Sequence, residues 1–283
     1  LLLVLIFGCD EPTYHTRTKF DNIQYIEGDL IKINNFFGLI DSVNNRLFMS
    51  IGINDISNFT GNIKYPENYA ITIKDIFVYS NQNYDFGNII LGEPIPTKIV
   101  KNDTIIIDYD LIFTTLSTIS ISTIDSILNE PKIFSKIILN DIENNKAYQM
   151  SAGIEIRGGT SQLYPKKSYD IEFWIDSSGS ETKKESLFGL RNDDDWHLDA
   201  MFIDISRSRN ILGMDTWSSF ARSNHLSIES EARLAQRGHL VELIINNQYA
   251  GIYSMNEQLD RKQLKLNKDN GLLYKTTSWS DEI

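Results

Sequence analysis

Two glycines and two lysines lie close together near the middle of the chain. Ile154 and Ile156 precede the glycines, and Ile171 and Phe173 follow the lysines, each alternating with polar neighbours as in half-buried strands. A glycine turn presents backbone N–H groups with no Cβ in the way, and a lysine beside it adds positive charge, so the pair is suited to binding phosphate. By itself the pattern also fits a simple hairpin. The two segments read Arg157-Gly158-Gly159-Thr160-Ser161 and Pro165-Lys166-Lys167-Ser168-Tyr169.

These two segments resemble the paired signature of the CotH family, the spore-coat protein H kinases. Further segments of the family's pattern follow in the same order, and several motifs in order are more specific than any one of them. The resemblance covers residues 131 to 283 or so, and it implies an atypical protein-kinase-like phosphotransferase that uses ATP and Mg²⁺. The further segments are Asp194–Ala200, Asp204 with Arg209-Asn210, Val241–Tyr253, Asn256-Glu257-Gln258 and Leu273-Tyr274-Lys275.

The resemblance implies a lysine that meets the nucleotide phosphates. Lys167 shares its strand parity with Ile171 and Phe173, whereas Lys166 shares it with Asp170. If the apolar residues face the core, we expect Lys167 to point toward the cleft and Lys166 toward solvent. The alternative is that both are surface lysines. The predicted nucleotide-binding residues are Arg157, Gly158, Gly159, Thr160, Ser161, Lys166 and Arg209, with Lys167 as the catalytic lysine.

A helix is predicted from Asp204 to Asn224, with Asp204 or Ser206 as its N-cap. Its apolar stripe comprises Ile211, Leu212, Trp217, Phe220 and Ala221. Arg209 lies in its first turns and either pairs with a carboxylate, touches phosphate or is a plain surface arginine.

A hairpin is predicted from Leu240 to Met255, with its turn at Asn246-Asn247-Gln248. It leads to Glu257, which by family position would pair with the cleft lysine. Glu242 and Asp260 are the alternatives for that role.

No metal ligands are predicted within these residues. Asp193-Asp194-Asp195 cannot all face one ion, so a solvated turn ahead of Trp196 is expected. In the CotH family the Mg²⁺ ligands lie after the Leu-Tyr-Lys strand, in an Asn-rich loop and a Trp-Asp-x-Asp segment, which would place them beyond residue 283. We therefore expect these residues alone to hold only part of the site and to be inactive without the rest.

The composition excludes some classes of partner. The formal net charge is −11, and no basic block occurs, so a nucleic-acid partner is not expected. Four scattered histidines and a single cysteine leave no internal disulfide and no cysteine zinc site.

The single cysteine follows an apolar run at the start of the chain. Leu1–Gly8 has the length of a signal-peptide core and is too short to span a bilayer. Gly8-Cys9 resembles a bacterial lipobox, in which the cysteine receives a diacylglyceryl group. We therefore expect a lipid anchor on Cys9 and a location in the bacterial cell envelope, at the outer membrane or cell surface. The alternative is a buried N-terminal strand with an incidental thiol.

The fold class expected is α+β. Residues 1–9 would be the signal end and lipobox, 10–20 a tether, 21–128 an all-β sandwich-like accessory module, and 129–283 the first part of the kinase-like domain. The module is predicted from runs at 47–53, 69–79 and 104–113 that are rich in β-branched and aromatic residues.

Two functions follow from these expectations. The first is a surface-anchored protein kinase that transfers phosphate from ATP to Ser or Thr of exported proteins. The second is a non-catalytic surface lipoprotein that uses the kinase-like fold and the β module for adhesion or scaffolding.

Overall fold

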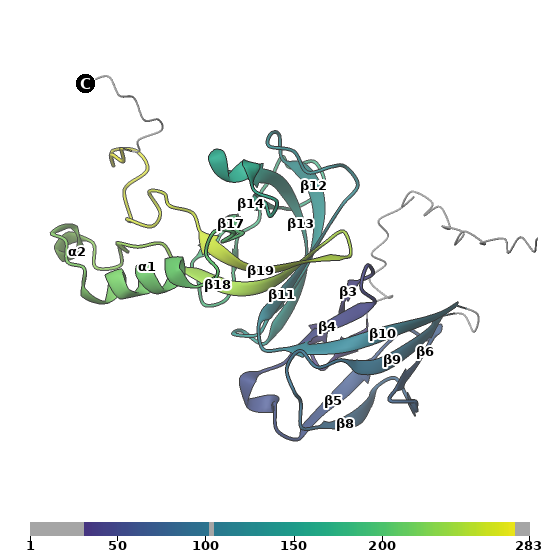
Figure 1. Ribbon diagram of the computed structural model, residues 1–283. Helices are drawn as coiled ribbons and strands as arrows, with labels where there is room; N and C mark the ends of the chain where they lie inside the picture. Colours follow the sequence, from purple (N-terminus) through teal and green to yellow (C-terminus); the bar gives the residue numbers. More distant parts are fainter. Residues whose placement is uncertain (1–30, 102–104, 275–283) are drawn as a thin grey trace, which may run out of the picture.

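The computed structural model describes residues 31–101 and 105–274. They are predominantly β, and form a pair of N-terminal sheets followed by a closed barrel (Figure 1). Cys9, the predicted tether at 10–20 and Lys275 lie outside the described residues. None of the helices in the described ranges has the length and hydrophobicity that a membrane crossing requires.

The N-terminal sheets enclose their own apolar core. β5 shows the alternation that creates it, because Phe59, Gly61 and Ile63 are buried and the residues between them are more exposed. The predicted sandwich-like β module is therefore present. One sheet has the order β2 (Phe36–Phe37), β1 (Lys32–Ile33), β5 (Phe59–Lys64), β8 (Gln82–Gly87). The other has the order β3 (Leu39–Asp41), β4 (Arg46–Ser50), β10 (Ile105–Thr114), β9 (Ile95–Lys101), β6 (Tyr69–Ile73), β7 (Ile76–Val78). The short 3₁₀ helix η1 (Ile53–Asp55) follows β4.

Seven strands form the barrel. Alternate residues point inward, and Trp196, Leu198 and Tyr253 are among the fully buried side chains that fill it. Two short strands, β15 (Glu185–Ser186) and β16 (Asn192–Asp193), pair beside it. In order around the barrel the strands are β11 (Ser117–Thr123), β12 (Ile133–Asp141), β13 (Lys146–Arg157), β14 (Ser168–Trp174), β17 (Asp195–Asp199), β19 (Gln248–Glu257) and β18 (Gly238–Ile245).

The expected domain boundary at residues 128/129 falls inside this barrel. β11 precedes it, yet Thr118–Thr123 pair with Ser135–Asn140 of β12 and Ser117–Ile121 pair in parallel with Val241–Ile245 of β18. The change of sheet instead occurs at Thr115 and Leu116, between β10 and β11. The reason is that β11 closes the barrel, which a domain starting at 129 would leave open. The fold by itself does not establish that this segment is kinase-like, so that remains a prediction.

The N-terminal sheets pack on the outer face of β11, β12 and β18. A third apolar cluster joins the two parts and includes Phe48, Ile138 and Ile244. Asn140 is fully buried at this junction: its Oδ1 accepts the Phe37 N–H at 2.9 Å, and its Nδ2 donates to the Phe37 carbonyl at 2.8 Å and to Thr118 Oγ1 at 2.9 Å. Because these contacts are buried and specific, the N-terminal sheets are fixed to the barrel and are not a loosely tethered spacer.

The predicted helix is shorter and less buried than expected. α1 spans Arg209–Phe220 with Ser208 at its N-cap, and α2 spans His225–Ile228. α1 projects away from the N-terminal sheets (Figure 1). No residue of α1 is buried, so its apolar stripe, Trp217 and Phe220 included, does not pack into a core within the described residues. Leu273 and Tyr274 lie outside any strand.

Replacing Asn140 with Ala should destabilise both parts of the protein together. The change leaves the N–H and the carbonyl of Phe37 buried without a partner, at about 1–3 kcal/mol for each unsatisfied group. Urea unfolding should show a loss of at least about 2 kcal/mol in one transition. Asn35→Ala is the control, since its 3.3 Å bond to Asn145 crosses the same junction at the surface. Equal small losses for both variants, or two separate transitions, would contradict the rigid junction.

Candidate functional site

A pocket of about 310 Å³ opens at the end of the barrel where β14 begins and β17 ends. Its walls come from the loop between β13 and β14 and from the segment that joins β17 to α1. Cationic, hydroxyl, carboxylate and aromatic side chains converge on it. The lining residues are Ser161, Tyr164, Lys166, Ser168, Asp199, Ala200, Met201, Phe202, Ile203, Asp204, Arg209 and Asn210.

Lys166 is the lysine that lines this pocket. Its Nζ donates to the carbonyl of Ile252 and lies 4.0 Å from the centroid of the Tyr253 ring. Burial is the main cause that lowers the pKa of Lys166 to about 8; the charge of Arg207 contributes in the same direction, and Asp199 acts in the opposite direction. Lys166 is thus a partly desolvated ammonium group that is held in place by β19.

Lys167 does not reach the pocket, contrary to the parity prediction. Its Nζ donates to the carbonyls of Gln162 and Tyr164, both at 2.6 Å, and so fastens the 3₁₀ turn η2 (Thr160–Leu163). The parity argument fails because β14 begins at Ser168, so neither lysine belongs to the regular strand. Ile171 and Phe173 belong to the core cluster of the barrel and do not line the pocket that Lys166 lines.

Of the predicted phosphate turn, only Ser161 lines the pocket. Gly158 is required for the turn itself, because its φ is +114° and a Cβ there would lie 1.9 Å from Ser161 Oγ. Arg157 points to the outer face of the barrel, where its Nε lies 3.4 Å from Asp170 Oδ1. Gly159 and Thr160 are not among the lining residues.

Arg209 lines the pocket from the first position of α1. Asp204 holds this end of the helix: its carboxylate accepts the backbone N–H groups of Ser206 at 3.1 Å, Ser208 at 3.0 Å and Arg209 at 2.8 Å. Arg209 Nε also lies 3.3 Å from Asp204 Oδ1. Of the three alternatives for Arg209, the structure shows pairing with a carboxylate, and the side chain is exposed enough to meet an anion.

Glu257 is not the partner of either lysine. It lies five residues along β19 from Ile252, beside the opposite end of β17, where its Oε1 accepts the N–H of Arg191 at 2.8 Å and lies 3.8 Å from Arg233. The alternatives fail as well. Asp260 pairs with Arg191 at 3.0 Å, and Glu242 accepts a 2.6 Å bond from Thr114 at the junction.

Glu257 instead belongs to an ionic network that fastens the chain after β19 to the barrel. Asp193 is fully buried there, pairing with Arg191 Nε at 2.7 Å and with Lys262 Nζ. Burial by itself would lower the pKa of Lys262, but its hydrogen bond to Asp193 and the charges of Asp193 and Asp194 raise it. The expected solvated turn at Asp193–Asp195 is thus wrong for Asp193, because the basic partners come from distant segments. Asp195 is the first residue of β17.

The pocket fits phosphate groups better than a metal ion. Within residues 31–101 and 105–274, no three His, Cys, Asp or Glu side chains are arranged to hold a metal. Asp199 and Asp204 both line the pocket, but Asp204 is engaged in holding α1, and Asp199 Oδ1 accepts the Met201 N–H at 2.9 Å. The described residues therefore do not form a Mg²⁺ site.

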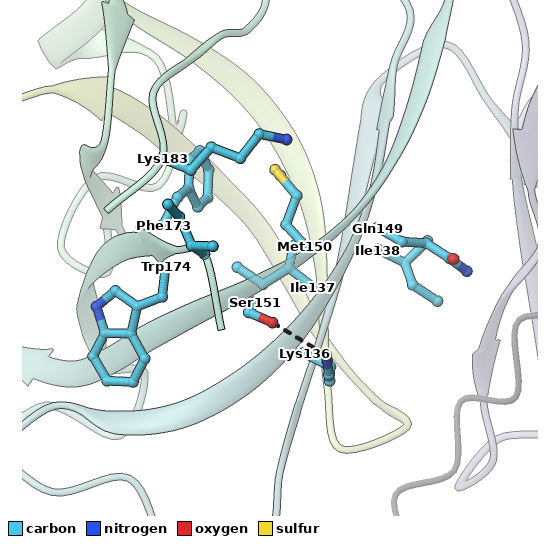
Figure 2. Close-up of a pocket in the computed structure, with 10 residues that line it drawn as sticks. Lys136, Ile137, Ile138, Gln149, Met150, Ser151, Phe173, Trp174 and Lys183 are labelled. Carbon is cyan, nitrogen blue, oxygen red and sulfur yellow. Dashed lines mark hydrogen bonds between the residues drawn. The ribbon is translucent and has the colours of Figure 1, made fainter. Parts of the chain in front are cut away.

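A second pocket, of about 320 Å³, lies beside β12, β13 and the end of β14 (Figure 2). Its cations are already engaged: Lys136 Nζ donates to Ser151 Oγ at 3.1 Å, and Lys183 pairs with Glu185 at 2.7 Å. Trp174 Nε1 donates to Glu172 at 2.8 Å. Because its polar groups satisfy one another, this pocket is a weaker candidate for an anion site.

Sequence reasoning missed two parts of the site. Asp199 was noted within a motif but not as a neighbour of Lys166, and the pairing of Tyr164 with Phe202 was not foreseen. Asp199 and Asp204 flank Ala200–Ile203, and an aspartate on each side indicates that side-chain hydrogen bonds to the backbone fix both ends of this segment. Only the fold shows that this segment faces Lys166.

The pKa of Lys166 can be measured directly by NMR on protein with ¹³C-labelled lysine. We expect a titration near pH 8. Asp199→Asn should lower this value, because it removes a charge that favours the ammonium form and retains an oxygen for the Met201 N–H. Asp108→Asn, at an exposed position on β10, should leave it unchanged. A Lys166 titration at the ordinary lysine value would contradict the half-buried placement.

The comparisons with known proteins bear on the same half of the chain. Residues 154–282 match a family model described as CotH kinase protein. No curated protein matches the chain. The family match starts within β13 and takes in every residue that lines the pocket between β14 and α1. It supports the resemblance seen in the motifs: residues 154–282 are similar to the CotH kinase family.

Proposed function

We propose that this protein transfers the terminal phosphoryl group of ATP to a hydroxyl of a protein substrate, and that the pocket lined by Lys166 and Arg209 holds the phosphates. The observation that carries the proposal is the meeting of these two cations with the hydroxyls of Ser161 and Ser168 in one cavity. Charge-assisted and hydroxyl hydrogen bonds are the groups by which proteins bind phosphate. The CotH kinase match supports the same chemistry.

The reaction needs little covalent chemistry from the protein. The substrate oxygen forms a bond to the γ-phosphorus, the bond to the bridging oxygen breaks, and ADP leaves while the hydroxyl proton is released. Lys166 and Arg209 would neutralise the phosphate charge and fix its position, and Asp199 would keep Lys166 protonated. A divalent metal would add charge stabilisation when bound, with ligands supplied from outside the described residues.

The finer proposal is that the acceptor is Ser or Thr of an exported or cell-surface protein, and that Cys9 carries the lipid anchor. It is supported by the apolar run before Gly8-Cys9 and by the CotH match of the second half.

Lys166 should matter more than Lys167 for nucleotide binding. Removing a charge-assisted contact to phosphate costs about 1.5–3 kcal/mol, so Lys166→Ala should weaken ATP binding tenfold or more in calorimetry on the full-length protein. Lys183→Ala is the matched control, because its ammonium is paired with Glu185 in another part of the barrel. A larger loss of ATP affinity in Lys167→Ala than in Lys166→Ala, with thermal stability unchanged, would contradict this proposal. It would make Lys167 the phosphate-binding lysine, as strand parity predicted.

Wild-type protein in its native host should fractionate with membranes, and Cys9→Ser should appear in the soluble fraction. The reason is that the thiol is the attachment point for the lipid in the proposed lipobox. Incorporation of labelled palmitate into wild type and its loss in Cys9→Ser checks that the diacylglyceryl group is attached at Cys9. Membrane retention of Cys9→Ser together with no label in wild type would refute the anchor.

A further inference from the structure

Part of the lining of the pocket consists of rings and apolar side chains. Tyr164 and Phe202 stack on each other with centroids 5.2 Å apart and an angle of 25° between the rings. Met201 and Ile203 extend this surface. Phe202 is 37% exposed, so part of its ring is free for another group to contact.

Three backbone donors near this aromatic pair are already used. The N–H of Tyr164 donates to the Ser161 carbonyl at 3.2 Å, that of Ala200 to Ser168 Oγ at 3.0 Å, and that of Met201 to Asp199 Oδ1 at 2.9 Å. Each backbone N–H has a single hydrogen, so none of these three remains for a ligand.

The carbonyls beside the pair are engaged as well. Arg207 donates to the carbonyls of Ala200 and Met201, and Met201 also accepts the Asp204 N–H at 3.1 Å. The Tyr164 carbonyl accepts from Lys167. A flat ring placed here would therefore find ring faces to stack on, while these three donors and three carbonyls are already engaged.

Resting on the proposed phosphate site, we propose that the Tyr164–Phe202 pair binds the base of the nucleotide by its face, and that the site discriminates little between bases. Stacking on an aromatic side chain tolerates any base because every base has a π-face, whereas selection needs hydrogen bonds to the base edge. Lys166 and Arg209, which line the same pocket, supply the affinity for the phosphates. The substrate class is a nucleoside triphosphate of either purine, with pyrimidines bound more weakly.

The test compares ATP, GTP and inorganic tripolyphosphate by calorimetry on the full-length protein. ATP and GTP should bind within threefold of each other, and tripolyphosphate at least tenfold more weakly. Phe202→Ala should weaken ATP and GTP about tenfold and leave tripolyphosphate unchanged, which also shows that the variant is folded. Ile205→Ala, a 91% exposed position in the same segment, is the control and should change nothing.

Three outcomes would overturn the inference. ATP binding tenfold or more tighter than GTP would mean that the base edge is read. Unchanged ATP affinity in Phe202→Ala would mean that the Tyr164–Phe202 pair does not bind the base, although the proposed phosphate site would stand. Failure of wild type to bind either ATP or tripolyphosphate would reject the phosphate site and the base platform together.

Discussion

The parallel pairing of β11 with β18 is the contact on which the rest of the structure depends. It joins Ser117–Ile121 to Val241–Ile245 and closes the barrel, so that neither β11 nor β18 is left as an open edge. The two strands are more than a hundred residues apart in sequence. Their inner side chains, such as Ile119, Ile121 and Leu243, become fully buried only when the barrel is closed. A parallel ladder of this span has a high loop-closure cost, which the shared interior offsets.

The closed barrel has outer faces and two ends, and each of these regions has a different role. The outer faces of β11, β12 and β18 are covered by the N-terminal sheets through Asn140 and the apolar cluster around Phe48. One end of the barrel carries the ionic network of Asp193, Arg191 and Lys262. The opposite end carries Lys166 and the pocket, where β14 starts and β17 stops. The site is thus made from loops whose ends are fixed by rigid strands, an arrangement that allows function without disturbing the core.

Local sequence pattern predicted the strands well and the site only in part. The β18–β19 hairpin and the β-rich first module follow from alternation and turn residues. The orientation of Lys166 and Lys167 does not, because parity holds only inside a strand and both precede Ser168. Glu257 has the right type of side chain to pair with a lysine, but it lies at the end of β19 away from Lys166. Which residues face each other across two strands depends on the pairing register, which the local sequence does not give. The boundary near 128 failed because β11 and β18 meet only in three dimensions.

The central claim is that Lys166 is the lysine at the nucleotide phosphates. Labelling with an acyl phosphate of ATP tests it most directly, since a lysine amine beside the bound phosphates attacks the acyl carbon, an amide forms and ATP leaves. Mass spectrometry of the digested protein should find the amide on Lys166, with free ATP suppressing it. Labelling of Lys167 instead, or of exposed lysines alone and without protection by ATP, would contradict the account.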